Sequence, residues 1–202
     1  MKLWLTSDEH YGHSNIIEYC KRPFSDVHEM TLGLIAKHNH LVGKDDIVWH
    51  LGDFCWKPKD VAEILKQLNG RHNLMVGNHD SCHPMHKNAE AETRKYLEAG
   101  FGVVKVSDVY FPKEGPDASF LGLPYKSGVT LTHMPFTPDE RHESNEKYKK
   151  WSPEDQGQVL LHGHVHDAWK VRGRQVNVGV DVWDYAPTTM ERVFARLAEG
   201  DS

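Results

Sequence analysis

The chain has 202 residues and a formal net charge of −5, and this length predicts one domain spanning residues 1–202. The acidic balance argues against a broad nucleic-acid-binding surface, which is normally basic, although it leaves room for a local basic patch. No apolar run approaches the roughly 18 residues that a membrane helix needs, which argues against a membrane protein. The three cysteines are widely spaced and form no disulfide framework, so we expect a cytoplasmic protein.

The first half of the chain alternates short apolar runs with helical patterns. The predicted strands cover residues 2–6, 46–51 and 73–76, and the predicted helices cover residues 12–20, 26–41 and 58–68. Asp26 and Glu29 have the spacing of a capping box at the start of the longest helix, which Gly43 closes. Pro58 is typical of a first helical turn. This βαβαβ order predicts right-handed crossovers and a parallel sheet.

The second half of the chain changes character after a helix expected over residues 87–98. Short β runs follow, and they predict a second, mixed sheet packed on the first. These runs cover residues 102–110, 118–123, 128–132, 158–161, 174–180 and 190–197. The polar segment 135–157 has two interpretations. It is either a solvated surface loop or a lid that contacts substrate, because it directly follows His133.

Side chains of the metal-binding type recur at five places, and four of these directly follow a predicted strand. The five places are Asp8-Glu9-His10, Gly52-Asp53, Gly77-Asn78-His79-Asp80, Thr132-His133 and Gly163-His164-Val165-His166. In an open parallel α/β sheet, ligands bind outside the carboxyl ends of the strands. We therefore expect these side chains, although far apart in the sequence, to meet at one sheet edge.

This mixture of carboxylate, imidazole and amide groups suits Mn²⁺, Fe or Zn²⁺, and no thiolate cluster indicates a structural zinc site. Two metals about 4 Å apart need a bridging ligand, and the carboxylate of Asp53 can serve. If Asp8 and Asp53 are the only anionic ligands, two dications leave about +2 of charge uncompensated, which favours a phosphate substrate. His79 could protonate the leaving alkoxide, and Asp80 could orient that imidazole.

The five motifs, in this order, resemble those of the calcineurin-like metallophosphoesterase superfamily, whose pattern is D-x-H, G-D, G-N-H-[DE], a lone H and G-H-x-H. The segment Thr6-Ser7-Asp8-Glu9-His10-Tyr11-Gly12-His13 also looks like the short stand-alone members found in bacteria and phages. The resemblance implies an α/β fold, a four-layer αββα sandwich in which helices flank two mixed β-sheets. It assigns one metal to Asp8, His10, Asp53 and His166, and the other to Asp53, Asn78, His133 and His164. His79 matches the catalytic histidine of the family.

The resulting prediction is a dimetal-dependent phosphoester hydrolase. We favour a phosphodiesterase in which a hydroxide bridging the metals attacks phosphorus, with a phosphomonoesterase as the alternative. A catalytically silent protein-interaction scaffold is a remote alternative, because every ligand position is retained. Mn²⁺ is the expected metal, with Fe, Zn²⁺ and Ni²⁺ as alternatives. The expected partner is a small phosphate ester or a nucleic-acid end, and the resemblance leaves a homodimer open.

Four residues are candidates for contact with substrate. Asn78 and His79 belong to the third motif. Arg22 could bind a phosphate group bidentately, or it could form a surface salt bridge. His13 flanks the first motif, with an ordinary loop role as its alternative.

Overall fold

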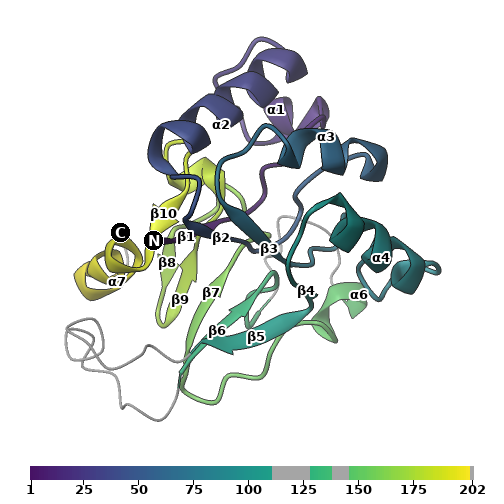
Figure 1. Cartoon of the computed structure of the whole chain (residues 1–202). Helices are drawn as coiled ribbons and strands as arrows, with labels where there is room; N and C mark the ends of the chain where they lie inside the picture. Colours follow the sequence, from purple (N-terminus) through teal and green to yellow (C-terminus); the bar gives the residue numbers. More distant parts are fainter. Residues whose placement is uncertain (111–127, 138–145, 201–202) are drawn as a thin grey trace.

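The computed structural model describes residues 1–110, 128–137 and 146–200, and its strands form two sheets (Figure 1). The first sheet has the order β10-β1-β2-β3-β4. These strands are β10 (Thr188–Thr189), β1 (Leu3–Thr6), β2 (Ile47–His50), β3 (Arg71–Met75) and β4 (Val104–Lys105). Strands β1 to β4 are parallel, and β10 runs antiparallel to β1. The predicted parallel arrangement of the first three strands is therefore confirmed.

The second sheet has the order β5-β6-β7-β9-β8. Its strands are β5 (Ser107–Tyr110), β6 (Val129–Thr132), β7 (Val159–His162), β9 (Gln175–Asn177) and β8 (Val171–Arg172). The central strands β6, β7 and β9 are parallel, and the outer strands β5 and β8 are antiparallel to their neighbours. The sheet is mixed, as predicted.

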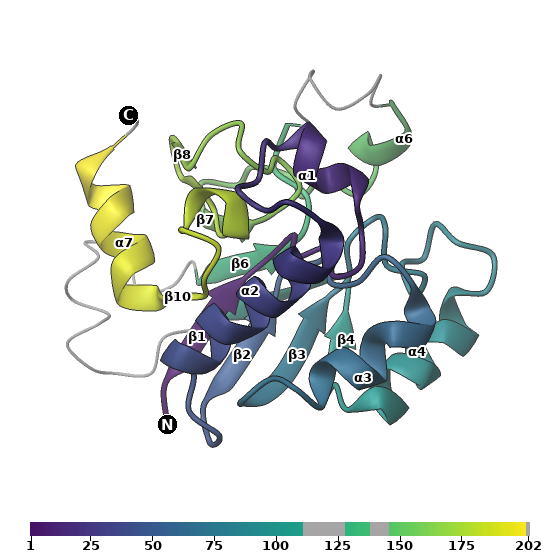
Figure 2. The same cartoon turned by 90° about the horizontal axis from the view of Figure 1, so that it is seen from above.

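Helices flank the sheets, which confirms the predicted α/β class with two mixed sheets. They are α1 (Asn15–Tyr19), α2 (Val27–Leu41), α3 (Val61–Leu65), α4 (Ala89–Ala99), α6 (Glu146–Lys149) and α7 (Met190–Glu199), with 3₁₀ turns η1 (Pro58–Asp60) and η3 (Val180–Val182). Helices α1 to α4 lie over the outer face of the first sheet (Figure 2). Their apolar side chains, such as Met30, Leu34 and Tyr96, form one core with Leu74 of β3.

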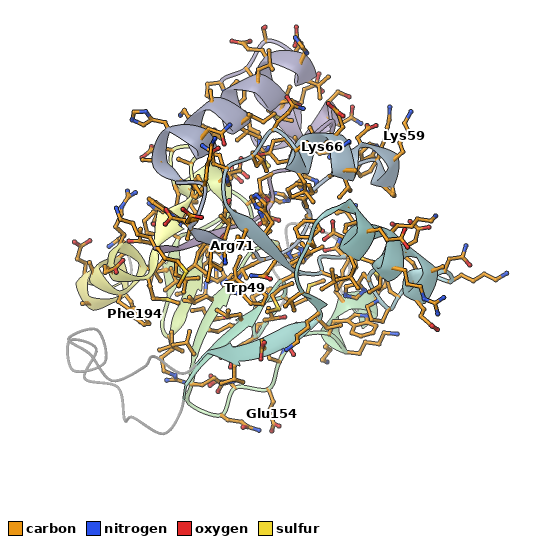
Figure 3. All side chains as sticks on the ribbon, in the orientation of Figure 1. Trp49, Lys59, Lys66, Arg71, Glu154 and Phe194 are labelled. Atoms are coloured by element: carbon orange, nitrogen blue, oxygen red, sulfur yellow. The ribbon has the colours of Figure 1, made fainter. Side chains whose placement is uncertain are left out.

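A second core fills the space between the two sheets. Leu5 and Met75 of the first sheet pack there with Leu131 and Leu161 of the second. Because side chains alternate between the faces of a strand, β3 contributes to both cores, with Leu74 in the first and Met75 in the second. Phe194 of α7 also packs against this second core and lies at its side (Figure 3). The sheets are thereby held with their carboxyl-terminal loops close together.

The prediction of a strand over residues 190–197 is wrong, because this segment belongs to helix α7. Val193, Phe194 and Leu197 have the spacing of one helical face, and all three pack against the core between the sheets. The Thr189 hydroxyl caps the helix by accepting a hydrogen bond from the Arg192 amide at 3.4 Å. The apolar run is short enough to fit both the side-chain period of a strand and that of a helix.

Two other predicted elements differ in detail. The run over residues 102–110 divides into β4 of the first sheet and β5 of the second, so the chain changes sheets at Val106. Asp26 caps α2 through the amides of His28 and Glu29, but the Glu29 carboxylate bonds to Ser25 instead of closing a capping box. The strand predicted over residues 118–123 lies outside the described residues. Among the described helices, none is long and apolar enough to span a bilayer.

Candidate metal centre

Five strand ends bring the predicted ligands to one place. Strands β1, β2 and β3 of the first sheet and β6 and β7 of the second are each followed by one of the motifs. Backbone hydrogen bonds join neighbouring loops: the Asp8 amide donates to the Gly52 carbonyl, and the His10 amide donates to the Asp53 carbonyl, both at 3.0 Å. The Gly163 amide donates to the His133 carbonyl at 3.1 Å. The Asp80 carboxylate joins the second loop to the third, and the His164 amide donates to the Asp8 carboxylate, so all five loops belong to one connected edge.

Asp53 lies between two groups of imidazoles. Its Oδ2 atom is 3.5 Å from Nε2 of His10 and 3.4 Å from Nε2 of His133. On the His133 side, Asn78 Oδ1 lies 3.1 Å from Nε2 of His133 and 2.9 Å from Nδ1 of His164. Separations near 3 Å are those expected between neighbouring ligands of one cation with bonds of about 2.1 Å.

The side chain of Asp8 connects the residues around Asp53 to His166, the remaining predicted ligand. The ligand atoms of Asp8, His10 and His166 lie within 4.8 Å of one another, and so do those of Asp8, Asp53 and His133. Asp8 belongs to both of these groups, and Asp53 lies between His10 and His133. All seven side chains predicted as ligands are therefore gathered in one buried cluster.

The backbone at these ligands adopts a conformation that is unusual for residues other than glycine. Among the described residues, eight non-glycine residues have positive φ, and five of them are predicted ligands. These five are Asp8 (58°), His10 (52°), Asp53 (55°), His164 (72°) and His166 (48°). Each such residue costs about 1–2 kcal/mol, and such strain concentrates at functional sites. The sharp turns point successive side chains toward the same space.

Hydrogen bonds to the far side of two imidazoles orient the rings. The His133 Nδ1–H group donates to the Leu51 carbonyl at 2.7 Å, which turns Nε2 toward Asp53. His166 Nδ1 lies 3.3 Å from Oδ2 of Asp181. Partners of this kind, placed behind a ligating histidine, fix its tautomer and raise its basicity.

Arg22 lies behind the cluster and does not face the cavity. Its buried guanidinium donates to both carboxylate oxygens of Asp181, at 2.8 and 2.9 Å, and to the backbone carbonyls of Asp8 and Glu9. The interpretation of Arg22 as a surface salt bridge is therefore corrected to a buried one. Its donors hold the first loop and Asp181 in place, so they are directed away from a phosphate group in the cavity.

The charges of the cluster suit a cation. Burial acts to raise the pKa of the Asp53 carboxyl, but His133 and His79 outweigh burial and hold that pKa well below its usual range. Burial acts to lower the pKa of His133, but Asp53 raises it to about 9. In the metal-free chain these two groups are thus an ion pair, and a cation that binds there must displace the His133 proton.

His10 has a buried ring nitrogen that is suited to bind a cation. Its Nε2 atom is buried and has no hydrogen-bond partner among the described residues. Burial lowers the pKa of His10 well below its usual value, so the ring is neutral and offers a lone pair. A buried polar atom without a partner normally costs about 1–3 kcal/mol. Together with the donor set around Asp53, this atom fits two divalent metal ions.

The cluster opens into a cavity of about 390 Å³. The exposed His79 lines it, with its ring centre 5.5 Å from that of His10, and its backbone amide donates to Asp53 Oδ1 at 2.9 Å. His13 also lines the cavity and stacks on Trp56 at 3.8 Å. Tyr148 of α6 lies over His164, with ring centres 5.6 Å apart. The described part of the segment 135–157 therefore contacts the site.

Asp80 does not orient the His79 imidazole as predicted. Its buried carboxylate accepts hydrogen bonds from three backbone amides, those of Asp53 (2.9 Å), Phe54 (3.1 Å) and Gly77 (2.8 Å). It thereby ties the second motif to the third. The neighbouring Gly77 is required for this approach, because a Cβ atom at that position would overlap the Asp53 carboxylate. Asp80 thereby fixes the backbone on which the Asp53 side chain is mounted.

We expect Asp80→Asn to weaken both the fold and the metal centre. Burial, with a further contribution from Asp53, raises the pKa of Asp80 to about 7, so the comparison belongs at about pH 8.5, where the carboxylate is ionised. An asparagine oxygen can replace one carboxylate oxygen, but its amide group would face a backbone N–H. The free energy of unfolding should fall by about 1–3 kcal/mol, and metal affinity by about 10–100-fold.

Thermal unfolding and isothermal titration with Mn²⁺ measure these two effects. Asp45→Asn is the matched control, because that carboxylate is 89% exposed. An unchanged metal affinity in Asp80→Asn would show that Asp80 does not position Asp53.

Several site residues gave no signal in the sequence. Asp181 connects Arg22 to His166, and Cys20 lies beside the same histidine, with its sulfur within 4.8 Å of ligand atoms of both His166 and Asp181. Trp56 and Tyr148 line the cavity. None of these residues belongs to a recurring motif, and their places depend on contacts between distant segments.

Comparison with known proteins decides the family. The model of the calcineurin-like phosphoesterase superfamily domain matches residues 1–183. The chain belongs to this superfamily. The calcineurin-like domain therefore spans all five motifs, and the resemblance inferred from them is confirmed. Membership and the grouped Asp and His side chains support a metal-dependent phosphoester hydrolase.

Relatives of the phosphoesterase domain come from phages and archaea. Gene 66 protein of Mycobacterium phage L5 is 32% identical over 188 residues, which cover 89% of this chain and 86% of the phage protein. Uncharacterized protein MJ1445 of Methanocaldococcus jannaschii is 30% identical over 209 residues, which cover 98% and 93% of the two chains. The crystal structure of AQ665 from Aquifex aeolicus, a protein of unknown function, is similar with a TM-score of 0.65 and 26% identity, over 96% of this chain and 98% of that one.

Proposed function

We propose that this phosphoesterase domain is a dimetal phosphodiesterase, with phosphomonoesterase activity as the alternative. The observation that carries the proposal is the position of Asp53 Oδ2, 3.5 and 3.4 Å from imidazole nitrogens of two ligand groups. A carboxylate shared in this way is what a two-metal hydrolytic site needs.

The chain's own side chains divide between the two ions. Asp8, His10, Asp53 and His166 would hold one ion, and Asp53, Asn78, His133 and His164 the other. Mn²⁺ is our first choice, because a set of carboxylate, imidazole and amide ligands without thiolate suits it, as it also suits Fe, Zn²⁺ and Ni²⁺. When bound, two divalent ions would supply a water-derived nucleophile at neutral pH and offset the charge that develops on the phosphate group.

The remaining residues would position the substrate and transfer a proton. His79 is exposed to the cavity while its backbone amide is fixed on Asp53, so its imidazole can reach the oxygen of a leaving group. Asn78 stands beside it and would contact both the ion and the phosphate oxygens. Asp80, through three backbone amides, keeps both loops in register. His13 lines the same cavity and would face the substrate.

The space around His79 supports a diester. His79 and Trp56 line both the cavity of about 390 Å³ over the metal ligands and a second cavity of about 840 Å³ beside it. A phosphodiester carries two substituents, and the site offers room on two sides of the phosphate position.

Turnover of two synthetic esters tests this proposal. Metal-stripped protein is supplied with Mn²⁺, Zn²⁺, Ni²⁺ or Fe²⁺ in separate samples, and the hydrolysis of bis(4-nitrophenyl) phosphate and 4-nitrophenyl phosphate is followed. We expect the diester to have the higher kcat/KM, with Mn²⁺ the best metal. Turnover of the monoester alone would favour the phosphatase alternative. If two ions bind and neither ester reacts, the protein-interaction scaffold becomes the better explanation.

A further inference from the structure

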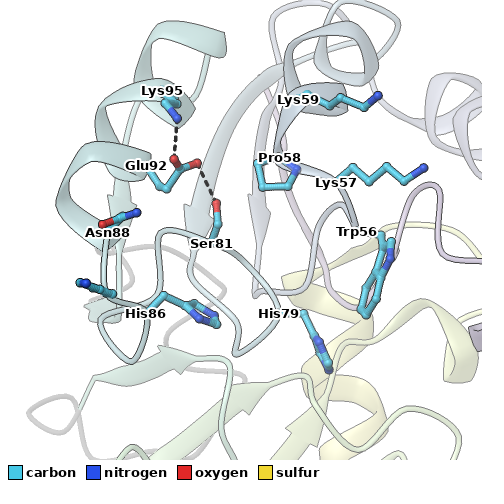
Figure 4. Close-up of a pocket in the computed structure, with 11 residues that line it drawn as sticks. Trp56, Lys57, Pro58, Lys59, His79, Ser81, His86, Asn88, Glu92 and Lys95 are labelled. Atoms are coloured by element: carbon cyan, nitrogen blue, oxygen red, sulfur yellow. Dashed lines mark hydrogen bonds and ion pairs between the residues drawn. The ribbon is translucent and has the colours of Figure 1, made fainter.

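The second cavity is a groove between the loop after β2 and helix α4 (Figure 4). Trp56, Lys57, Pro58 and Lys59 form one wall, and Asn88, Glu92 and Lys95 of the α4 region form the other, with His79 at the end of the groove next to the metal centre. The two walls are more than 25 residues apart in the sequence. The groove therefore exists only in the folded chain.

The groove is positively charged in an otherwise acidic protein. Four lysines line it, Lys57, Lys59, Lys87 and Lys95, against a single carboxylate, whereas the whole chain has a net charge of −5. That carboxylate, on Glu92, is already held by the Ser81 hydroxyl at 3.0 Å and by the Lys95 ammonium at 2.5 Å. No carboxylate of the described residues pairs with the other three lysines. Their charge is left for an anion, and their long stems let the ammonium groups move toward it.

The groove also has an exposed aromatic wall. Trp56 is 42% exposed, although tryptophan normally buries most of its surface. His13 lies parallel to it, with ring centres 3.8 Å apart and an interplanar angle of 4°, which fixes the orientation of the indole. A ring that is held in this way and partly exposed to the groove is a platform on which a planar ring of a ligand can stack.

His79 determines which part of a substrate enters the groove. If His79 protonates the leaving oxygen, as in the proposed function on which this step rests, the leaving group lies on the His79 side of the phosphate. The groove begins there. We propose that the groove is the leaving-group subsite and that it takes a nucleotide-like group, with a planar base against Trp56 and a further phosphate among Lys57, Lys59 and Lys87.

The reaction is a balanced hydrolysis. The oxygen of a water molecule forms a new bond to phosphorus, and the bond between phosphorus and the leaving oxygen breaks. His79 gives its proton to the leaving oxygen and regains the proton that the attacking water releases, so that one water molecule is consumed. The products are a phosphomonoester and a nucleoside alcohol that still carries its own phosphate. The charge of the lysines and the stacking on Trp56 both act on the leaving group only. They therefore favour diesters whose leaving group carries a base and a further phosphate.

Three thymidine dinucleotides separate the contribution of the second phosphate. These are TpT, its 5′-phosphorylated form pTpT and its 3′-phosphorylated form TpTp, compared at low ionic strength because exposed charges are screened by salt. One of the two phosphorylated forms places its extra phosphate on the leaving side, and we expect its kcat/KM to exceed that of TpT about tenfold. The double variant Lys57→Gln/Lys59→Gln should bring this ratio close to one. The control Lys44→Gln/Lys66→Gln removes two exposed lysines outside the groove and should keep the ratio.

The base is tested with Trp56→Leu and with an analogue of the preferred dinucleotide that lacks its bases. Trp56→Leu should lower kcat/KM for the normal dinucleotide about tenfold more than kcat/KM for the base-free one. Trp56→Phe keeps an aromatic ring and should therefore retain most of the preference for the normal dinucleotide. Equal turnover of TpT, pTpT and TpTp, or a ratio that survives in the double lysine variant, would overturn the inference. So would hydrolysis of bis(4-nitrophenyl) phosphate without any hydrolysis of the dinucleotides, a result that leaves the proposed function standing. Failure to hydrolyse the synthetic diester with any metal would instead refute the proposed function itself.

Discussion

Asp53→Asn is expected to lower kcat/KM for bis(4-nitrophenyl) phosphate by about 10³-fold or more, equivalent to a loss of about 4 kcal/mol of transition-state stabilisation. Asp53 is the one side chain that both predicted ligand groups share. Asparagine keeps the size and one oxygen but removes the negative charge, so it cannot offset two dications. The bound Mn²⁺, measured by elemental analysis after gel filtration, should fall from two ions per chain to one or fewer.

The matched control is Asp45→Asn, which makes the same chemical change at an exposed carboxylate far from the cluster. Its turnover and metal content should equal those of the unmodified protein. Circular dichroism checks that Asp53→Asn remains folded. We expect it to fold because the asparagine oxygen can still accept the hydrogen bond from the His79 backbone amide. Full activity in Asp53→Asn would rule out a carboxylate bridge at this position.

His79→Gln is expected to affect substrates according to their leaving groups. General acid catalysis typically contributes 10²–10⁴-fold, but 4-nitrophenolate leaves readily without a proton. We therefore expect kcat for a diester with an alkoxide leaving group, such as a dinucleotide, to fall by about 10²-fold or more. The turnover of bis(4-nitrophenyl) phosphate should fall by about tenfold at most.

Glutamine retains the backbone amide that donates to Asp53, so the variant isolates the imidazole. Its Mn²⁺ content should be unchanged. His40→Gln serves as the control, because His40 is an exposed histidine of helix α2 that lines neither cavity. A loss of equal size for both kinds of leaving group would indicate that His79 acts on the phosphate and not on the leaving oxygen.

The ligand set was readable from the sequence because strand ends are local features. The apolar runs that became β1, β2, β3, β6 and β7 were followed within three residues by Asp, Asn or His, and parallel strands place their carboxyl ends at one edge. Asp8, Asp53 and Asn78 follow β1, β2 and β3 in this way, and the positive φ of Asp8 and Asp53 shows how sharply the chain turns there. The order of the motifs also specified the superfamily that the family model confirms.

Predictions about single side chains outside these motifs were less successful. Arg22 was expected at the surface and is buried against Asp181, a residue 159 positions away. Asp80 was expected to hold an imidazole and instead holds three backbone amides. The segment 190–197 was expected to be a strand and is a helix, because its burial between sheet edges suits the helical spacing of Val193 and Phe194.

The sequence by itself determined the kinds of metal-binding side chain, their order along the chain, the α/β class and the position of His79 in the motif that follows β3. These properties follow from short-range patterns, in which residue type and strand period are read within a few positions. The tertiary structure alone decided which imidazole nitrogens lie next to Asp53 and which groups orient the rings of His133 and His166. It alone also brought Trp56 and the lysines together in one groove beside His79. Such arrangements depend on how the two sheets and α4 pack, and packing energy is distributed over contacts between residues that no local pattern connects.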